Sequence, residues 1–338
     1  MNIKAGYTFD DVLLVPKYSD IDSRSNVDLT THLGKGVKLT IPVVSANMKN
    51  VTEFHMALAI AELGGLGIIH RFWDHAYNMV AHVQDVLRRT KDLGWLPNVG
   101  ASVGVQDRDF EVVDQLVEVG CKIVCVDVAH GHHIKAMEMT TRIAKKYPHV
   151  LLIAGNIATK NGALALVGSG ADVIKVGVGG GSLCTTRIET GNGVPQLTAL
   201  MNVYEAHQKV QFAMIADGGI RRAGDIVKAL CFSEAVMLGN VLAGTDEAPG
   251  TVITIDNSKY KEYAGSSTYK TSHVEGITGL VPCKGPVKPI IRRLMEGVRS
   301  GLSYQGANNL VELRSDPQFV TITNAGLTES HPHDVMKR

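Results

Sequence analysis

The sequence predicts a (β/α)8 barrel, and two patterns indicate it. Short apolar runs rich in valine and isoleucine alternate with longer amphipathic segments, and eight such runs occur in 338 residues. Parallel strands covered on both faces have this continuous apolar pattern. Eight regular units favour a barrel over the alternative, a doubly wound open sheet. Polar and glycine residues gather after the runs, which in a barrel is the face that carries the active site.

The eight runs are the expected barrel strands. They span residues 41–46, 66–70, 100–103, 123–128, 150–154, 173–176, 213–216 and 235–238. We expect one catalytic domain over residues 1–338. Residues 259–285 break the helical pattern and are predicted to form an active-site excursion beyond the eighth strand. The polar tail, residues 321–338, is expected to lie outside the core.

Composition excludes several classes of partner. Apolar residues make up 45% of the chain and charged residues 20%, which is ordinary for a globular protein. The net charge of +1 gives no support to a nucleic-acid partner. No signal peptide pattern is present, and no run approaches the roughly 20 apolar residues that span a bilayer. We therefore expect a cytoplasmic protein without a membrane partner.

The five cysteines do not suggest a disulfide framework, because their number is odd and they are scattered. Cys121 and Cys125 lie in the apolar run CKIVCVDV, which reads as a strand. Buried structural thiols are favoured there over a zinc pair. Cys184 differs because glycines surround it.

The segment GVGGGSLCTTR, residues 177–187, is the strongest local signal. A cysteine on a glycine loop at a barrel mouth is exposed, and nearby backbone N–H groups can favour its thiolate. Thr185 and Thr186 can hydrogen-bond to it or relay a proton. The alternative is a tight turn with an incidental cysteine. From the residues alone, the two interpretations stand level.

Two glycine loops after the last two runs predict a phosphate site. Gly218 and Gly219 follow the seventh run, and Gly239 and Asn240 follow the eighth. Barrels often bind phosphate with these two loops. Asp217 would repel phosphate, so we expect it to accept hydrogen bonds from ribose hydroxyls. The alternative is a pair of glycine turns without a ligand.

Other polar residues have weaker interpretations. Asp127 is predicted to contact a cofactor. His130, His132 and His133 lie close by, but no carboxylate or cysteine set completes a metal shell. Glu275 is a candidate general acid or base, and its alternative is a solvated loop carboxylate.

Six motifs together resemble one family over nearly the whole chain. They are TFDDVLLVP (8–16), SRS (23–25), GSLCTTR (181–187), TGNGVPQL (190–197), ADGGIR (216–221) and GTDEAPG (244–250). The family is that of inosine monophosphate dehydrogenase and guanosine monophosphate reductase. The resemblance implies a barrel, a purine nucleoside monophosphate, a nicotinamide cofactor and a homotetramer. It places the nucleophile that attacks purine C2 at Cys184 and a catalytic threonine at Thr186.

The resemblance also implies the remaining site residues, with Glu275 as a catalytic residue. Substrate contacts are expected from Asn47, Ser182, Asp217, Gly218, Gly219, Gly239, Asn240, Gly265 and Ser266. Cofactor contacts are expected from Arg71, Asp127, Ala129 and Asn156. A potassium ion would be held by Gly179, Gly181 and Cys184 with Glu329, Ser330 and His331 of a neighbouring subunit. Residues 70–100 are too few to hold the CBS modules that dehydrogenases usually insert there.

The two activities of the family differ in their need for water. The dehydrogenase hydrolyses its adduct with a water that an Arg–Tyr pair on a long flap activates. Residues 265–275 are few and contain no arginine. The reductase expels ammonia and receives a hydride, so it does not need that flap. Asn47, His70-Arg71-Phe72 and the run YKEYAGSS (260–267) are also reductase-like.

Other features look like the dehydrogenase, namely GTDEAPG, Val194 and the tail at 329–335. We give the missing flap chemistry more weight, because hydrolysis fails without it. The predicted reaction is NADPH-dependent reductive deamination of GMP to IMP and ammonia. The alternative is IMP dehydrogenase, which converts IMP to XMP with NAD. No dinucleotide fingerprint separates NADPH from NADH. A non-catalytic nucleotide-binding barrel is disfavoured by Cys184, Thr186 and Glu275 together.

Overall fold

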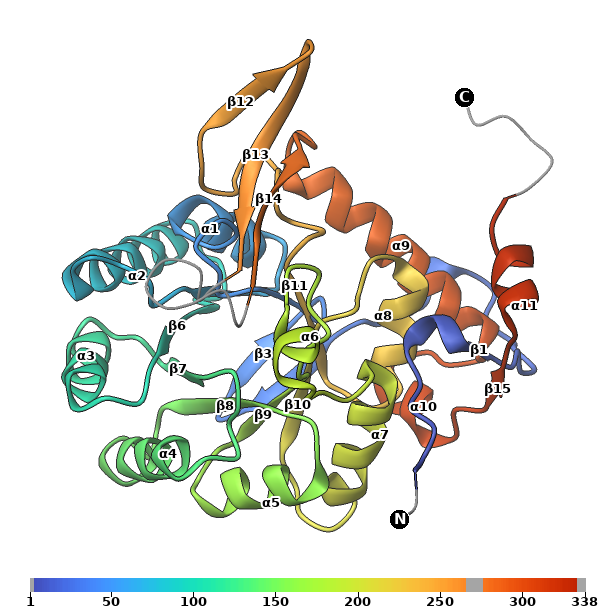
Figure 1. The fold of residues 1–338 in the computed structure, drawn as a ribbon, viewed down its shortest axis with the longest axis horizontal. Coiled ribbons are helices and arrows are strands. Elements are labelled where there is room, and N and C mark those ends of the chain that lie inside the picture. The colour runs from blue at the N-terminus through green and yellow to red at the C-terminus, as the bar shows by residue number, and fades with distance from the viewer. Residues whose placement is uncertain (1–2, 266–275, 333–338) are drawn as a thin grey trace.

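Eight parallel strands close into a barrel in the order β10-β11-β4-β5-β6-β7-β8-β9 (Figure 1). The computed structural model describes residues 3–265 and 276–332. The barrel strands are β4 (Val43–Ser45), β5 (Leu66–Ile69), β6 (Val99–Val103), β7 (Ile123–Asp127), β8 (Leu151–Ile157), β9 (Val173–Val176), β10 (Ala213–Asp217) and β11 (Ala235–Leu238). Each of the eight apolar runs overlaps one of these strands. The predicted (β/α)8 barrel is therefore confirmed.

Helices surround the barrel, and all but the shortest of them bury one stripe. They are α1 (Phe54–Glu62), α2 (Ala76–Asp92), α3 (Asp107–Glu118), α4 (Ile134–Lys146), α5 (Lys160–Gly168), α6 (Thr186–Thr190), α7 (Gln196–His207), α8 (Ala223–Leu230) and α9 (Val287–Tyr304). In α9, Ile291, Met295, Val298 and Leu302 are buried at helical spacing. Because α9 follows the excursion and packs on α8, it completes the eighth β/α unit.

Strand β8 differs from its predicted length. We expected it to end at residue 154, but it continues to Ile157 with an irregular register between Gly155 and Ile157. The predicted boundary was wrong because Gly155 and Asn156 have the composition of a loop. A bulge re-aims a side chain within a strand, and here the bulged residue, Asn156, reaches the neighbouring strands.

The excursion after β11 is a small antiparallel sheet that stands away from the barrel (Figure 1). Its strands are β12 (Val252–Ile255), β13 (Ser258–Ala264) and β14 (Thr278–Pro282). Asp256 and Asn257 join β12 to β13 with positive φ angles of 45° and 61°, as tight hairpin turns require. The buried Lys261 donates to the carbonyls of Thr245 and Ala248, at 2.9 and 2.7 Å, and so fixes the sheet to the loop after β11.

A hairpin covers the amino-terminal end of the barrel. It is formed by β2 (Thr31–Gly34) and β3 (Val37–Leu39), and Leu33 and Leu39 are buried. Lys35 in its turn donates to the carbonyl of Val150, directly before β8. The carboxyl ends of the strands are therefore the end at which a ligand can enter.

Segments near the two ends of the chain pair with each other on one side of the barrel. Strand β1 (Val12–Leu14) pairs antiparallel with β15 (Phe319–Thr321). The remaining elements are the 3-10 helices Phe9–Asp11 and Arg24–Asn26 and the helices α10 (Leu310–Ser315) and α11 (Asn324–Glu329). Part of the predicted tail therefore has regular structure, although its side chains are mostly exposed.

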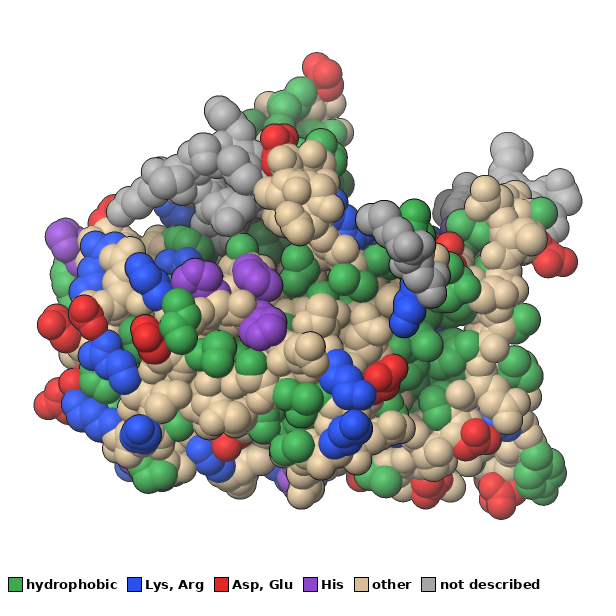
Figure 2. Space-filling model, turned by 60° about the horizontal axis from the view of Figure 1, so that its bottom comes forward, with side chains coloured by type: hydrophobic (Ala, Val, Ile, Leu, Met, Phe, Trp, Pro, Cys, Tyr) green, Lys and Arg blue, Asp and Glu red, His purple; other side chains and the backbone are tan. Residues whose placement is uncertain are grey.

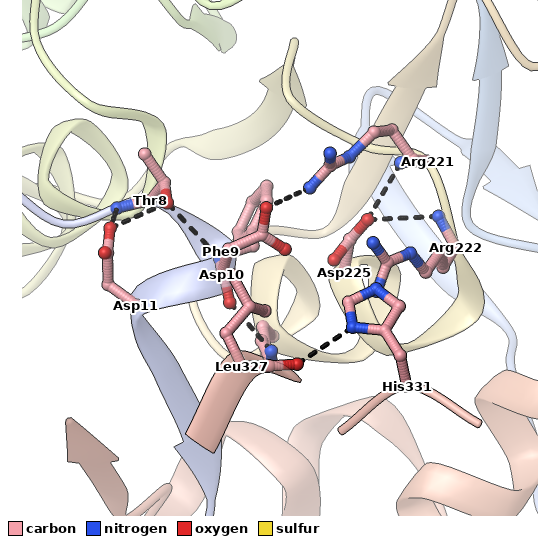
Figure 3. Close-up of polar contacts among 10 residues, drawn as sticks. Thr8, Phe9, Asp10, Asp11, Arg221, Arg222, Asp225, Leu327 and His331 are labelled. Carbon is pink, nitrogen blue, oxygen red and sulfur yellow. Dashed lines mark hydrogen bonds and ion pairs between the residues drawn. The ribbon is translucent and has the colours of Figure 1, made fainter. Parts of the chain in front are cut away.

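Two of the family motifs contact each other beside this region (Figure 3). The Arg221 guanidinium of ADGGIR pairs with the carboxylate of Asp10 in TFDDV. The Asp225 carboxylate accepts the backbone N–H groups of Arg221 and Arg222, at 2.9 and 3.0 Å. Lys228, which lies in α8 with Asp225, donates to the carbonyl of Phe9 at 2.8 Å. The N-terminal motif thus fixes the start of α8.

Acidic and basic side chains are interspersed on the face that Figure 2 shows. Within residues 3–265 and 276–332, none of the helices has the length and apolar character that a bilayer crossing requires.

Candidate active site

A cavity of about 890 Å³ opens at the carboxyl ends of the barrel strands. It brings together most of the predicted site residues. Those that line it are Asn47, Arg71, Asp127, Ala129, Asn156, Gly179, Gly181, Ser182, Cys184, Thr186, Asp217, Gly218 and Gly265. Its volume is typical of small-molecule sites.

Three predicted substrate contacts do not line this cavity, namely Gly219, Gly239 and Asn240. Gly239 lies directly behind its wall, because a Cβ there would be 3.0 Å from Tyr263 Oη and 3.5 Å from Met48 Sδ. Two further predicted residues, Ser266 and Glu275, lie outside the described residues.

Cys184 is the candidate nucleophile. Its backbone N–H donates to the carbonyl of Gly181 at 3.1 Å, and its thiol donates to the Thr186 hydroxyl, with Sγ 3.1 Å from Oγ1. The side chain is half-buried and lines the cavity. By contrast, Cys121 and Cys125 are buried and free, as predicted. Burial raises the pKa of Cys121 to about 11, so that thiol is a poor source of the thiolate nucleophile.

Arg187 holds the cysteine loop in place. Its Nη2 donates to the carbonyl of Val194 at 2.6 Å and to that of Val178 at 3.3 Å. The arginine side chain passes between Gly179 and Gly193, and a Cβ on either glycine would lie 2.6 Å from Arg187 Cγ. Both glycines have positive φ, 78° and 159°. The glycines of this motif therefore make room for a side chain to which the sequence had assigned no role.

The excursion returns to the cysteine loop. The N–H of Ile277 donates to the carbonyl of Leu183 at 3.1 Å, and the N–H of Gly265 donates to the carbonyl of Ile277 at 3.0 Å. A Cβ on Gly276 would lie 3.1 Å from Gly265 Cα. Gly265 and Gly276 thus lie together, beside the residue that precedes Cys184.

A buried lysine lies at the base of the cavity. Lys175 Nζ on β9 is 2.9 Å from Asp127 Oδ1 and 2.9 Å from Asp217 Oδ2. It also donates to Asn156 Oδ1. The Asn156 amide in turn donates to Asp217 Oδ2 and to the carbonyl of Gly177. Lys175 was not predicted from the sequence, although a single charged residue inside the apolar run VIKV can indicate a buried functional group.

The ion pairs keep Lys175 and Asp127 charged. Burial opposes the charge of Lys175, but Asp127 and Asp217 outweigh it and hold the pKa of the lysine above its usual value. Burial also opposes the charge of Asp127, but Lys175 and then Arg71 hold the pKa of that carboxyl below its usual range. A charged carboxylate in the cavity can accept hydrogen bonds from ribose hydroxyls.

His70 braces another part of the cavity wall. Its ring is buried and stacked on Trp73, with centroids 4.6 Å apart. Nδ1 accepts the backbone N–H of Phe72 at 3.1 Å, and Nε2 lies 3.2 Å from Glu53 Oε1. Burial lowers the pKa of His70, with Glu53 opposing the shift. The neutral imidazole therefore fixes the segment that carries Arg71 into the cavity.

The predicted potassium ligands do not meet within one chain. Gly179 and Gly181 line the cavity, whereas His331 follows α11 and bonds to the carbonyl of Leu327 at 2.8 Å (Figure 3). Because the prediction takes the tail from a neighbouring subunit, it stays a prediction. Among the described residues, no group of three or more His, Cys, Asp or Glu side chains is placed to hold a metal ion.

Comparison with known proteins agrees with this geometry. The IMP dehydrogenase / GMP reductase domain matches residues 6–333. Inosine-5'-monophosphate dehydrogenase of Borreliella burgdorferi is 39% identical over 98% of each chain, and that of Aquifex aeolicus is 36% identical over 98% of this chain and 96% of its own. A crystal structure of GMP reductase from Trypanosoma brucei in complex with guanosine 5'-monophosphate has a TM-score of 0.92 and 32% identity, over 99% of each chain. Among the described residues, no CBS domain is evident. The chain therefore belongs to the IMP dehydrogenase / GMP reductase family of purine nucleotide oxidoreductases.

Proposed function

We propose that the protein reduces GMP to IMP and ammonia with NADPH, through a covalent adduct on Cys184. One observation carries this choice. The Cys184 thiol shares the cavity with the Thr186 hydroxyl, while the segment between Gly265 and Gly276, whose ends border the cysteine loop, contains no arginine. A covalent purine adduct is hydrolysed only if a base activates water beside it. The family's Arg–Tyr flap is the base that this sequence lacks.

In the proposed reaction, the Cys184 sulfur forms a bond to purine C2. The bond from C2 to the exocyclic amino nitrogen breaks, and ammonia leaves with a proton that Thr186 and Glu275 supply. A reduced nicotinamide provides the hydride that C2 gains. The C2–S bond then breaks, which releases IMP and restores the thiolate. Covalent catalysis in this form divides one difficult displacement into two easier steps.

The described residues fit both ligands. The loops at Gly218 and Gly180 lie in contact, because a Cβ on Gly218 would be 3.2 Å from the Gly180 carbonyl carbon. Such a backbone cradle suits the nucleotide phosphate, and Asp217 beside it suits the ribose. We assign Asn47, Ser182 and Gly265 to the same ligand. The contacts expected from Gly219, Gly239 and Asn240, which do not line the cavity, and from Ser266, which lies outside the described residues, stay predictions. Arg71, Asp127, Ala129 and Asn156 would hold the nicotinamide cofactor.

IMP dehydrogenase with NAD is the second candidate, and a specific observation favours it. Relatives that are 32–39% identical over most of the chain are named inosine-5'-monophosphate dehydrogenase. In the segment 266–275, Tyr269 and Lys270 are the plausible substitutes for the missing base. A lysine can act as a base when its pKa is strongly lowered.

Steady-state rates distinguish the two candidates. One assay contains GMP with NADPH, and the other contains IMP with NAD, both with the same enzyme preparation. We expect the first to be faster. If IMP with NAD yields XMP faster than GMP with NADPH yields IMP, the reductase assignment is wrong. The rate of Lys270→Ala would then show whether that residue had replaced the flap base.

We also propose a cytoplasmic homotetramer in which a neighbour's Glu329, Ser330 and His331 complete a potassium site at the cysteine loop. The glycine loop that would supply the carbonyls supports this proposal. Light scattering measures the oligomer, and rates in potassium against sodium buffers test the ion. A monomeric enzyme that does not distinguish the two ions contradicts it.

A further inference from the structure

One lysine lies between the two carboxylates to which we assign different ligands. Lys175 Nζ donates to Asp127 Oδ1, to Asp217 Oδ2 and to Asn156 Oδ1, which uses the three N–H groups of an ammonium. The Lys175 side chain is 3% exposed, against 16% for Asp127 and 23% for Asp217. The ammonium is therefore enclosed, while each carboxylate keeps part of its surface in the cavity.

Other titratable groups surround these three residues. Arg71, after β5, adds positive charge near Asp127. Cys125 on β7 faces Lys175, and burial raises the pKa of its thiol, so it stays neutral. Tyr263 on β13 lies near Asp217, and burial raises the pKa of its phenol. Lys175 and the two aspartates together carry a net charge of −1, and Arg71 adds one positive charge beside Asp127.

We propose that Lys175 is a positioning residue that serves both half-sites, because it holds Asp127 and Asp217 in place and orients each toward its ligand. This inference rests on the proposed function, which gives Asp217 to the nucleotide and Asp127 to the cofactor. The nucleotide site and the cofactor site are then not independent, because one ammonium orients the acceptor groups of both.

The physical reason is the distance between the two acids. Their oxygens contact the same nitrogen, so they lie no more than about 6 Å apart. Without the ammonium, two negative charges would face one partly enclosed space, and one carboxyl group would take up a proton. A shared proton can hold the pair in place at low pH. At higher pH the proton is lost and the carboxylates repel each other.

Nucleotide binding to Lys175→Met tests this directly. Titration calorimetry with GMP and with IMP gives Kd for the full chain, at about pH 6 and about pH 8. Titration of the nucleotide phosphate affects the Kd of both proteins alike, so it cancels in the ratio of the variant's Kd to the wild-type Kd. We expect the ratio to exceed one and to rise with pH, by up to about tenfold per pH unit for one linked proton.

Two further variants separate positioning from packing. Lys261→Met removes another buried lysine, whose ammonium donates to the carbonyls of Thr245, Asp246 and Ala248. We expect its Kd ratio to be independent of pH. Lys175→Met combined with Asp127→Asn removes one positive and one negative charge and so keeps the net charge of −1. The Kd ratio of this double variant should also be independent of pH.

The outcomes are distinct. A Lys175→Met ratio within about twofold of one at both pH values overturns the inference, as does a pH dependence that Asp127→Asn leaves unchanged. If Lys175→Met fails to fold but the double variant folds, unpaired carboxylates are the cause and the inference is supported. If neither folds, Lys175 acts by packing and the inference is wrong. A wild-type protein that binds neither nucleotide removes the proposed function itself, together with this inference.

Discussion

The side-chain amide of Asn156 donates to the carboxylate of Asp217, with Nδ2 2.9 Å from Oδ2. The same nitrogen donates to the carbonyl of Gly177 at 2.8 Å, where the cysteine loop begins. One side chain on β8 therefore joins the predicted ribose acceptor to the segment that carries Cys184. The bulge in β8 places the amide there, so a local irregularity of one strand sets the geometry between two parts of the site.

Asn156→Ala should lower kcat/KM by about tenfold or more, because an unsatisfied buried polar group costs about 1–3 kcal/mol. Asn156→Asp keeps the shape but puts a further carboxylate beside Asp217, so we expect a larger loss than with alanine. Steady-state kinetics measures both. Variants within about twofold of wild type would show that the amide does not position Asp217.

Cys184→Ala should abolish turnover while nucleotide binding persists, because deletion of the nucleophile removes the covalent pathway. Kinetics and calorimetry with the same protein test the two parts. Cys283→Ala is the matched control, since Cys283 is also half-buried but does not line the cavity. We expect it to behave like wild type. Turnover of Cys184→Ala within about tenfold of wild type would contradict the assignment of Cys184 as the nucleophile.

Gly193→Ala should displace Arg187 and disorder the cysteine loop, because its Cβ would lie 2.6 Å from Arg187 Cγ. Gly191→Ala is the control, with a φ of 69° and nothing within 4 Å of the new Cβ. Backbone strain of about 1–3 kcal/mol should lower Tm in both variants. Only Gly193→Ala should lose turnover. The rate at which an alkylating reagent modifies Cys184 should likewise change in this variant and not in Gly191→Ala. Equal loss of activity in both variants contradicts the role of Arg187.

Stability should fall in acid partly through His70. Burial lowers the pKa of this imidazole in the folded state, so its contribution is present above the unfolded value of about 6.5 and is lost as pH falls through the folded pKa. One such group adds a slope of at most about 1.4 kcal/mol per pH unit. Urea unfolding of His70→Gln between about pH 7 and about pH 5 should show a flatter slope than wild type. His149→Gln, which changes an exposed histidine, should not have a flatter slope. Equal slopes for all three proteins would contradict the role of His70.

The barrel could be predicted because its strands are buried on both faces, which leaves a readable apolar run for each. The mouth residues could be predicted as a set because the carboxyl ends of parallel strands share one face, and Cys184, Asp217 and Asp127 do line one cavity. Family resemblance added their roles, which the residues alone did not provide.

The rest depended on contacts between distant segments. Lys175 was missed because its partners lie on β7, β8 and β10 and its own run is apolar. Arg187 was missed because its carbonyl partners belong to two loops. The end of β8 was misplaced because a bulge, unlike a strand, has no apolar pattern. Gly239 lies behind the cavity wall, which no spacing of glycines indicates.

The pairing of β1 with β15 makes the chain almost a ring, since segments near its two ends already lie together through Val12 and Thr321. A linker that joins the residues before β1 to those after β15 would therefore add a covalent connection beside an existing contact. The exposed turn at Asp256 and Asn257, between β12 and β13, offers a place to open new termini outside the barrel. A circular permutant cut there would keep all eight barrel strands in their present order, because permutation is tolerated best at exposed turns.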